Sequence, residues 1–190
     1  YGYTADHCRR AVDMIKADAL IFHLNPLQEA IQPGGNRNFF RLTEKIEEVC
    51  RKIEIPVIVK EVGSGISSRD ARLLLDAGVS AIDCAGAGGT SWSEVERKRA
   101  RTPEDERVAS YFSEWGIPTS ISLQNVLSQS KSITLIASGG IKNGVDGAKA
   151  FSLGTDLVGI AMPLLASAVE SEAAVIRELE IFRDTLRMAM

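Results

Sequence analysis

The sequence predicts an α/β protein, specifically the C-terminal portion of a (β/α)8 TIM barrel with about five of the eight βα units. Short apolar runs with β-strand character alternate with segments of helical periodicity, which is typical of βαβ units in a parallel sheet. Glycines follow these runs, at the edge where a barrel builds its active site. Because five parallel strands would leave an open edge and a half-filled interior, we infer that three strands are missing at the N-terminus. The chain starts at Tyr1 and not at a methionine, so we expect it to be part of a longer protein.

The order of the elements follows from periodicity. Apolar runs predict five strands, at residues 19–25, 56–62, 80–85, 134–138 and 157–161. Helical spacing predicts helices at residues 42–53, from residue 67 onward, at 143–153 and, as one long amphipathic helix, at 164–190.

Composition favours one domain over residues 1–190. The chain has 190 residues, of which 45% are hydrophobic, and this is enough for one substantial core. A net charge of -3 argues against a general binder of nucleic acid or of membrane surfaces. No apolar stretch reaches the roughly 20 residues that a membrane helix needs, and no signal peptide is visible. The three cysteines are far apart and odd in number, which favours the reducing cytoplasm.

One segment departs from the regular alternation of strands and helices. The gap between the third and fourth predicted strands is roughly twice a usual unit, and it holds an excursion at residues 91–118. Its basic residues near Arg99 are closely flanked by carboxylates, so a nucleic-acid site is the weaker interpretation. We expect a solvated excursion that acts as an active-site lid.

Polar side chains follow the first predicted strand. Alternation puts Ile21, His23 and Asn25 on one face, which becomes polar towards the carboxyl end, while the opposite face is apolar and belongs under helices. After Pro26 ends the strand, a loop carries three more polar side chains, Gln28, Glu29 and Gln32. A loop that satisfies only its own backbone is the alternative, but the number of such groups at a barrel rim favours a functional site.

Lys60 lies late in an otherwise apolar strand. A lysine there is costly unless it meets a fixed negative partner. We therefore interpret it as a cation aimed at an anionic ring or oxygen. The alternative is a lysine that extends its ammonium to solvent at the rim.

Two glycine-rich loops follow later strands, at residues 86–91 and 138–144. The first supplies close backbone approach and hydroxyls, and the second opens a helix whose exposed N–H groups can bind phosphate. Two such loops on neighbouring strands predict a phosphorylated cofactor, although neither matches the nucleotide-binding glycine patterns in their proper context.

The sequence offers few groups for acid–base chemistry. It has no serine–histidine–acid arrangement and no metal-binding histidine run, and His7 is expected at the surface of an early helix. Glu29 is a single carboxylate, suited to one hard cation held partly by a substrate phosphate. We assign Asp83 and Cys84 to packing or turn support. The shortage of protein acids and bases indicates that a bound cofactor performs the proton or electron chemistry.

Several stretches together resemble one known family. HLNPLQE with Gln32 behind it, VIVKEVGSGIS, IDCAGAGGTSW, WGIPT and SGGIKNGVDGAKAFSLGTDLVGIA are similar to the motifs of type 2 isopentenyl-diphosphate isomerase. The first motif is specific to that family, and the glycine-rich ones are shared with other flavin barrels. The resemblance spans the whole chain. It implies a (β/α)8 barrel that holds FMN, is active with the flavin reduced, commonly by NADPH, and requires Mg2+.

The resemblance also implies roles for individual residues. Gln28 would contact the isopentenyl group near the protons that move, with His23 beside it as a second catalytic residue, and Asn25 and Gln32 would bind substrate. Glu29 would hold Mg2+. Residues implied to bind FMN are Lys60 and Thr90, at the ring and its surroundings, and Gly139, Gly140, Ala161 and Met162, at the phosphate. Family members often carry serine at the position of Ala85, so one flavin hydrogen bond is lost here. The resemblance also implies further flavin contacts and a basic pair for the diphosphate in the missing N-terminal part.

The expected activity is the 1,3-allylic isomerisation of isopentenyl diphosphate to dimethylallyl diphosphate. A different flavin barrel, such as a 2-hydroxy-acid oxidase, is one alternative, but it needs a histidine base and no histidine follows His23. A barrel fragment that only binds phosphate is the other. We expect a small diphosphate substrate, no nucleic-acid or membrane partner, and a homo-oligomer.

Overall fold

The computed structural model describes residues 3–190, so the first two residues of the predicted domain lie outside the described part. Five parallel strands form one sheet in the order β1-β2-β3-β4-β5. Their bounds are β1 Leu20–His23, β2 Val57–Lys60, β3 Ala81–Asp83, β4 Thr134–Ala137 and β5 Leu157–Val158. Each lies within a predicted run, so all five predicted strands and the α/β class are confirmed. Neighbouring strands are consecutive in the chain, as in a (β/α)8 barrel.

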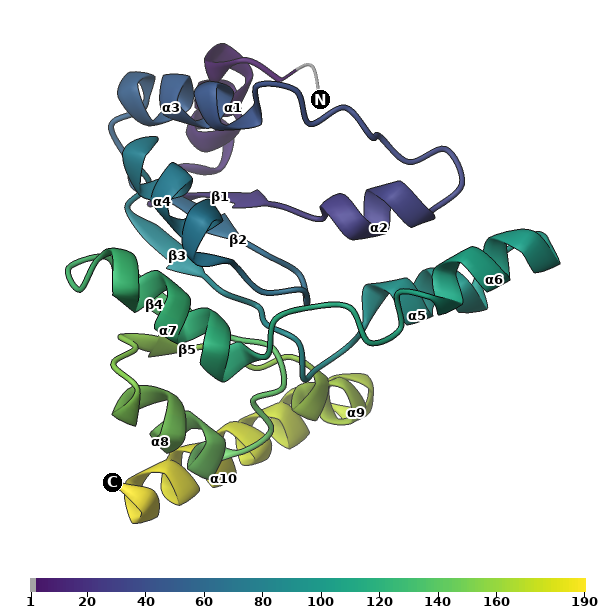
Figure 1. Cartoon of the computed structure of the whole chain (residues 1–190). Helices are drawn as coiled ribbons and strands as arrows, with labels where there is room; N and C mark the ends of the chain where they lie inside the picture. The colour runs from purple at the N-terminus through teal and green to yellow at the C-terminus, as the bar shows by residue number, and fades with distance from the viewer. Residues whose placement is uncertain (1–2) are drawn as a thin grey trace.

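Helices connect the strands and cover one face of the sheet (Figure 1). Their bounds are α1 Ala5–Ile15, α2 Pro26–Ile31, α3 Leu42–Lys52, α4 Ser68–Asp76, α5 Trp92–Lys98, α6 Pro103–Ser110, α7 Thr119–Gln129, α8 Gly144–Ser152, α9 Met162–Glu170 and α10 Glu172–Ala189. The predicted helices at 42–53, from 67 and at 143–153 correspond to α3, α4 and α8. Within residues 3–190, no helix combines the length and the apolar character needed to cross a membrane.

The main core lies between the sheet and the helices α3, α4, α7 and α8. Val59, Ile82 and Leu135 point to this side from three adjacent strands and are fully buried. Leu74 of α4 and Leu123 of α7 pack against them. Burial of such side chains supplies the main favourable free energy of folding, about 1.5–3 kcal/mol each.

The opposite face of the sheet is open. The register aligns Ile21 with Ile58 and Ile136 with Leu157 on this face. Ile21 and Leu157, on the two edge strands, are 54% and 52% exposed. The alternation predicted for the first strand is therefore confirmed, since Ile21 and His23 lie on the open side and Phe22 packs against the core.

The prediction of a loop after the first strand is wrong. Gln28 and Glu29 lie on helix α2, and Gln32 is the C-cap of this helix. Pro26 does end the strand, but it also occupies the first turn of this helix. Proline is tolerated there because its missing N–H would have no partner inside the helix.

The single C-terminal helix predicted over 164–190 is also wrong. Ser171 adopts an extended conformation, ends α9 and caps α10 by accepting a hydrogen bond from the N–H of Ala174. A serine whose hydroxyl binds the backbone competes with helix continuation and favours a new helix start.

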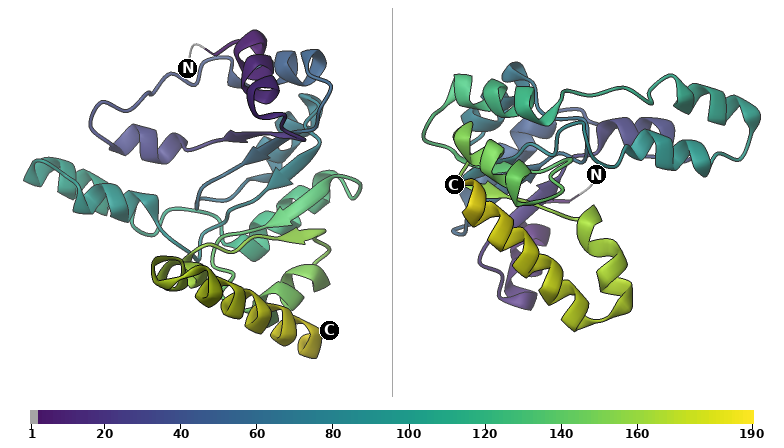
Figure 2. Two further views of the ribbon diagram at one scale, coloured as in Figure 1. Left: turned by 180° about the vertical axis from the view of Figure 1, so that it is seen from behind. Right: turned by 90° about the horizontal axis from the view of Figure 1, so that it is seen from below.

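Most of the predicted excursion forms a helical hairpin of α5 and α6, which projects beyond the carboxyl ends of the strands (Figure 2). Ser91 and Thr102 cap the two helices. Arg97 pairs with Glu94 and with Glu106, so part of the charged run neutralises itself. Helix α2 contacts both helices of the hairpin, which places the polar side chains of α2 beside this excursion.

The sheet core makes a direct prediction about stability. Replacing fully buried Leu135 by alanine removes core contacts and leaves a cavity, which costs about 2–5 kcal/mol. Urea unfolding measures this loss. Leu165 of α9 is 66% exposed, and its alanine variant is the matched control that should change stability little. Equal losses for both variants would contradict the assignment of the core.

Candidate active site

A pocket of about 660 Å³ opens at the carboxyl ends of the strands. Each strand or the residues directly after it contributes to the wall, with His23, Lys60, Asp83, Ser138 and Gly159. In parallel α/β sheets this edge is where ligands bind. The predicted site residues that line this one pocket are His23, Lys60, Thr90, Gly139, Gly140, Ala161 and Met162.

Two glycine loops meet backbone to backbone at the rim of this pocket. A Cβ atom on Gly139 would lie 2.1 Å from the carbonyl oxygen of Gly86, and one on Gly140 would lie 2.6 Å from that of Gly88. Both Gly139 and Gly140 have positive φ, at 91° and 82°. Any other residue would push the loops apart, so glycine is required for this close approach. Thr119 donates its hydroxyl proton to the Gly139 carbonyl at 2.5 Å and holds the second loop in place.

Ala161 and Met162 bring a helix N-terminus to the same pocket. Helix α9 begins at Met162, and its N-cap Ala161 offers no side-chain hydrogen bond to the first-turn N–H groups. Such groups and the positive end of the helix dipole favour an anion. The glycine loops and this helix start therefore form a wall that could hold a phosphate.

Lys60 faces a carboxylate across the sheet. Its Nζ lies 3.3 Å from Oδ2 of Asp83 and donates a second hydrogen bond to the backbone oxygen of Glu61 at 3.2 Å. Oδ1 of Asp83 accepts from the Ser138 hydroxyl at 2.5 Å and from the Ala85 N–H at 3.2 Å. The assignment of Asp83 to turn support was therefore incomplete, because it also partners the predicted functional cation. Cys84, by contrast, is fully buried in the core.

His23 lies next to Lys60 in the register of β1 and β2. Burial and the positive charge of Lys60 both lower the pKa of the His23 imidazole. The ring is therefore neutral at neutral pH and can donate or accept a hydrogen bond at the pocket wall. His7, as predicted, lies exposed in the first turn of α1.

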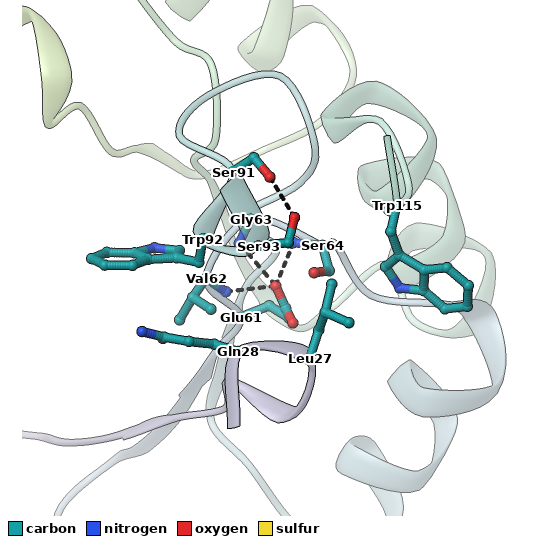
Figure 3. A pocket seen from close by; sticks show the side chains of 10 residues that line it. All are labelled: Leu27, Gln28, Glu61, Val62, Gly63, Ser64, Ser91, Trp92, Ser93 and Trp115. Carbon is teal, nitrogen blue, oxygen red and sulfur yellow. Dashed lines mark hydrogen bonds between the residues drawn. The ribbon is translucent and has the colours of Figure 1, made fainter. Parts of the chain in front are cut away.

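Gln28 lines a second hollow of about 10 Å³, which has room for about one water molecule and which Figure 3 shows between α2 and the start of α5. Trp92, Val62 and Gly63 line both hollows, so the two adjoin. Nε2 of Gln28 donates to Oε1 of Glu96 at 3.0 Å. Glu96 is only 3% exposed, and Arg99 lies 3.5 Å from it.

Glu96 was missed because it stands inside a charged run that looks solvated. The signal for its burial is the α5 spacing: Ser93 and Glu96 are three residues apart, share one helix face and are both buried. A buried carboxylate requires donors, and Gln28 provides one. Glu96 therefore belongs to the candidate site.

Glu61 is a second buried carboxylate that the sequence did not single out. Its Oε2 accepts the backbone N–H groups of Val62, Gly63 and Ser64 at 2.6, 2.9 and 2.6 Å (Figure 3). Burial raises the pKa of Glu61, although these hydrogen bonds favour the charged form. The side chain fixes the loop after β2, which separates the two hollows.

Asn25 connects the remaining polar residues of the first motif. Its Nδ2 lies 3.3 Å from Oε1 of Gln28 and 3.2 Å from Oε1 of Glu29. Oε2 of Glu29 accepts the N–H of Asn36 at 2.5 Å. Asn25, Glu29 and Gln32 line neither of the two hollows described above, so the predicted residues converge only in part. Within residues 3–190, no three histidine, cysteine or acidic side chains gather into a metal site.

Curated relatives carry one name. The chain is 53% identical over 174 residues to the isopentenyl-diphosphate delta-isomerase of Nostoc sp., covering 92% of this chain and 50% of that protein. The chain is 56% identical over 168 residues to the Synechocystis protein of the same name, covering 88% of this chain and 48% of that protein. The chain is 50% identical over 190 residues to the protein of the same name from Rickettsia rickettsii, covering 100% of this chain and 56% of that protein. The resemblance stated above is thus confirmed. The chain spans about half the length of the curated relatives it matches.

Solved structures support the fold. A mandelate oxidase structure matches with a TM-score of 0.65 at 23% identity, covering 98% of this chain and 54% of that one. A mandelate oxidase mutant with a monooxide FMN adduct matches with a TM-score of 0.64 at 23% identity, covering 98% of this chain and 53% of that one. At this identity the likeness concerns the fold alone, and it supports the five βα units as part of a (β/α)8 barrel.

The sequence profile of one family spans most of the chain. It is described as FMN-dependent dehydrogenase, and it matches residues 28–190. That range contains both glycine loops, Lys60 and the helix start at Met162. The chain therefore belongs to the FMN-dependent dehydrogenase family.

Proposed function

We propose that this chain forms part of an isomerase that converts isopentenyl diphosphate to dimethylallyl diphosphate by 1,3-allylic proton transfer with reduced FMN. The observation that carries the proposal is the pocket of about 660 Å³ that Lys60 and two glycine loops line at the strand ends. Gln28 lies at a small hollow that adjoins this pocket and is bonded to the buried carboxylate of Glu96. Relatives about 50% identical and named isopentenyl-diphosphate delta-isomerase support the same activity.

The lining of the larger pocket fits FMN in its chemistry. Gly139, Gly140, Ala161 and Met162 would hold the phosphate, because all four line this pocket and the last two form the N-terminus of α9. Lys60 would face the ring, with Thr90 at its side. When bound in its reduced form, FMN would supply the group that exchanges protons with the substrate, and NADPH would supply the reducing electrons.

The chain's own residues would orient the reacting group of the substrate beside the larger pocket. The isomerisation adds one proton at the terminal alkene carbon and removes one allylic proton, so it needs no net redox change. Gln28 would orient the isopentenyl group, and the buried Glu96 carboxylate, which accepts a hydrogen bond from Gln28, would hold the Gln28 side chain in place. His23, neutral at the pocket wall, would act beside them through hydrogen bonds.

Substrate and metal would bind through the other polar residues of the first motif. Glu29 would hold Mg2+, with the diphosphate and water as the remaining ligands, since a single carboxylate suits such partial coordination. Asn25, which already contacts both Gln28 and Glu29, and Gln32 at the end of α2 would bind substrate.

The oxidase alternative has less support. A 2-hydroxy-acid oxidase needs arginine for the substrate carboxylate and a histidine base. Among the described residues that line the larger pocket there is no arginine, and the one histidine, His23, comes from the first strand.

We also propose a cytoplasmic homo-oligomer. Support comes from the free state of Cys8, Cys50 and Cys84 and from apolar Val169 on α9, which is 84% exposed.

An anaerobic assay tests the activity. The protein as encoded, with any sequence that flanks residues 1–190, is mixed with FMN, NADPH, Mg2+ and isopentenyl diphosphate. We expect dimethylallyl diphosphate, and deuterium in the product when the solvent is D2O. Bound FMN without product, together with oxidation of a 2-hydroxy acid, would favour the oxidase. Failure to change the flavin absorbance would leave only a phosphate-binding fragment.

The Glu96 carboxylate gives a specific kinetic prediction. Replacing Glu96 by glutamine replaces the charged acceptor of the Gln28 amide by a weaker neutral one and loosens the Gln28 side chain, so kcat should fall by about tenfold. FMN binding should not change, because Glu96 does not line the larger pocket. Exposed Glu104 of α6 provides the control substitution, Glu104→Gln. Unchanged turnover in Glu96→Gln would remove this residue from the mechanism.

A second prediction concerns the metal. In Glu29→Gln the proposed metal carboxylate is lost. The Mg2+ concentration for half-maximal activity should rise at least about tenfold, since even outer contacts of a metal contribute roughly 10–100-fold in affinity. A magnesium titration of turnover measures it, with Glu47→Gln on the exposed part of α3 as control. If both variants keep the wild-type magnesium dependence, Glu29 is not the ligand.

A further inference from the structure

The Asp83 carboxylate joins three separate parts of the larger pocket. Oδ2 lies 3.3 Å from the Lys60 ammonium on β2. Oδ1 accepts the Ser138 hydroxyl after β4 and the Ala85 N–H at the start of the first glycine loop. No other side chain that lines the larger pocket is described with contacts to all three of these wall segments.

The surroundings of this carboxylate make its charge effective. Its side chain is 13% exposed, against 32% for Lys60, so water screens the pair less than it would at the surface. The nearby His23 imidazole is neutral, and Lys142 is the other cation on the pocket wall. Asp83 is therefore the acidic side chain that offsets the Lys60 charge among the described residues that line the pocket.

We propose that Asp83 is a positioning residue that fixes the Lys60 ammonium at the pocket wall and sets how strongly the site favours reduced over oxidised flavin. The proposal rests on the proposed function only in its assignment of FMN to this pocket. Lys60 stabilises an anionic reduced ring, and Asp83 partly neutralises Lys60. The carboxylate thereby limits the preference for the reduced form and keeps the cation in a fixed place.

Asparagine separates the charge of Asp83 from its shape. In Asp83→Asn the amide oxygen can still accept from Ser138 and Ala85, but the opposing NH2 group has no negative charge for Lys60. The ammonium is then left without its counter-charge beside the ring. The affinity for reduced FMN should rise relative to the affinity for oxidised FMN.

The test measures two FMN dissociation constants, one for the oxidised and one for the reduced flavin, in the protein as encoded. In Asp83→Asn the ratio of the oxidised to the reduced constant should rise about tenfold or more, since a neighbouring unit charge shifts such equilibria by roughly one to three powers of ten. A tenfold change corresponds to about 30 mV in the midpoint potential of the bound flavin. Spectroelectrochemical titration reads this shift independently of turnover.

Matched variants separate this role from simple loss of structure. Asp156 also accepts a backbone N–H, that of Leu135, at the opposite end of the sheet, and Asp156→Asn should leave the ratio unchanged. In a Lys60→Gln background the effect of Asp83→Asn should shrink, because its partner is gone. A ratio in Asp83→Asn equal to that in Asp156→Asn, or lower than wild type, would overturn the proposal.

Two further outcomes also decide the question. If Asp83→Asn fails to fold, Asp83→Ser also removes the charge and leaves a smaller polar side chain. Its ratio should move in the same direction, whereas a wild-type ratio would refute the positioning role. Wild-type protein that binds FMN without isomerising isopentenyl diphosphate would contradict the proposed function alone. Wild-type protein that binds no FMN would overturn both proposals.

Discussion

The parallel register of the first three strands governs the chemistry of this molecule. It sets His23 beside Lys60 and Lys60 beside Asp83, each as the last residue of its strand. A shift by one residue would turn all three side chains into the helix-covered core, where unpaired charges are costly. The apolar alternation of Phe22, Val59 and their neighbours excludes that shift, so core packing determines where the polar groups stand.

Buried and half-buried carboxylates hold the site together, and each accepts hydrogen bonds from a different part of the chain. Glu61 takes three backbone N–H groups of its own loop, Glu96 takes the amide of Gln28, and Asp83 takes Lys60 and Ser138. Such networks cost free energy unless all partners are present. The polar groups thus lock the loops at the strand ends into one arrangement around the two hollows.

The sequence predicted the strands well, because they follow from local rules of periodicity, but it did not predict that the two glycine loops contact each other. It failed where one residue serves two elements: Ser171 ends one helix and begins another, and Pro26 ends a strand and starts α2. It also failed to place Glu96, whose burial depends on the tertiary contact of α5 with α2. Charge alone did not distinguish a solvated carboxylate from one that is buried against Gln28.

The central claim is that the strand ends and the two glycine loops form one flavin pocket. The most direct measurement is a crystal structure of the protein grown with FMN. The account predicts the phosphate against the backbone of Gly139 and Gly140 and the ring within hydrogen-bonding distance of the Lys60 ammonium. An FMN molecule bound elsewhere, with Lys60 and the glycine loops untouched, would contradict it.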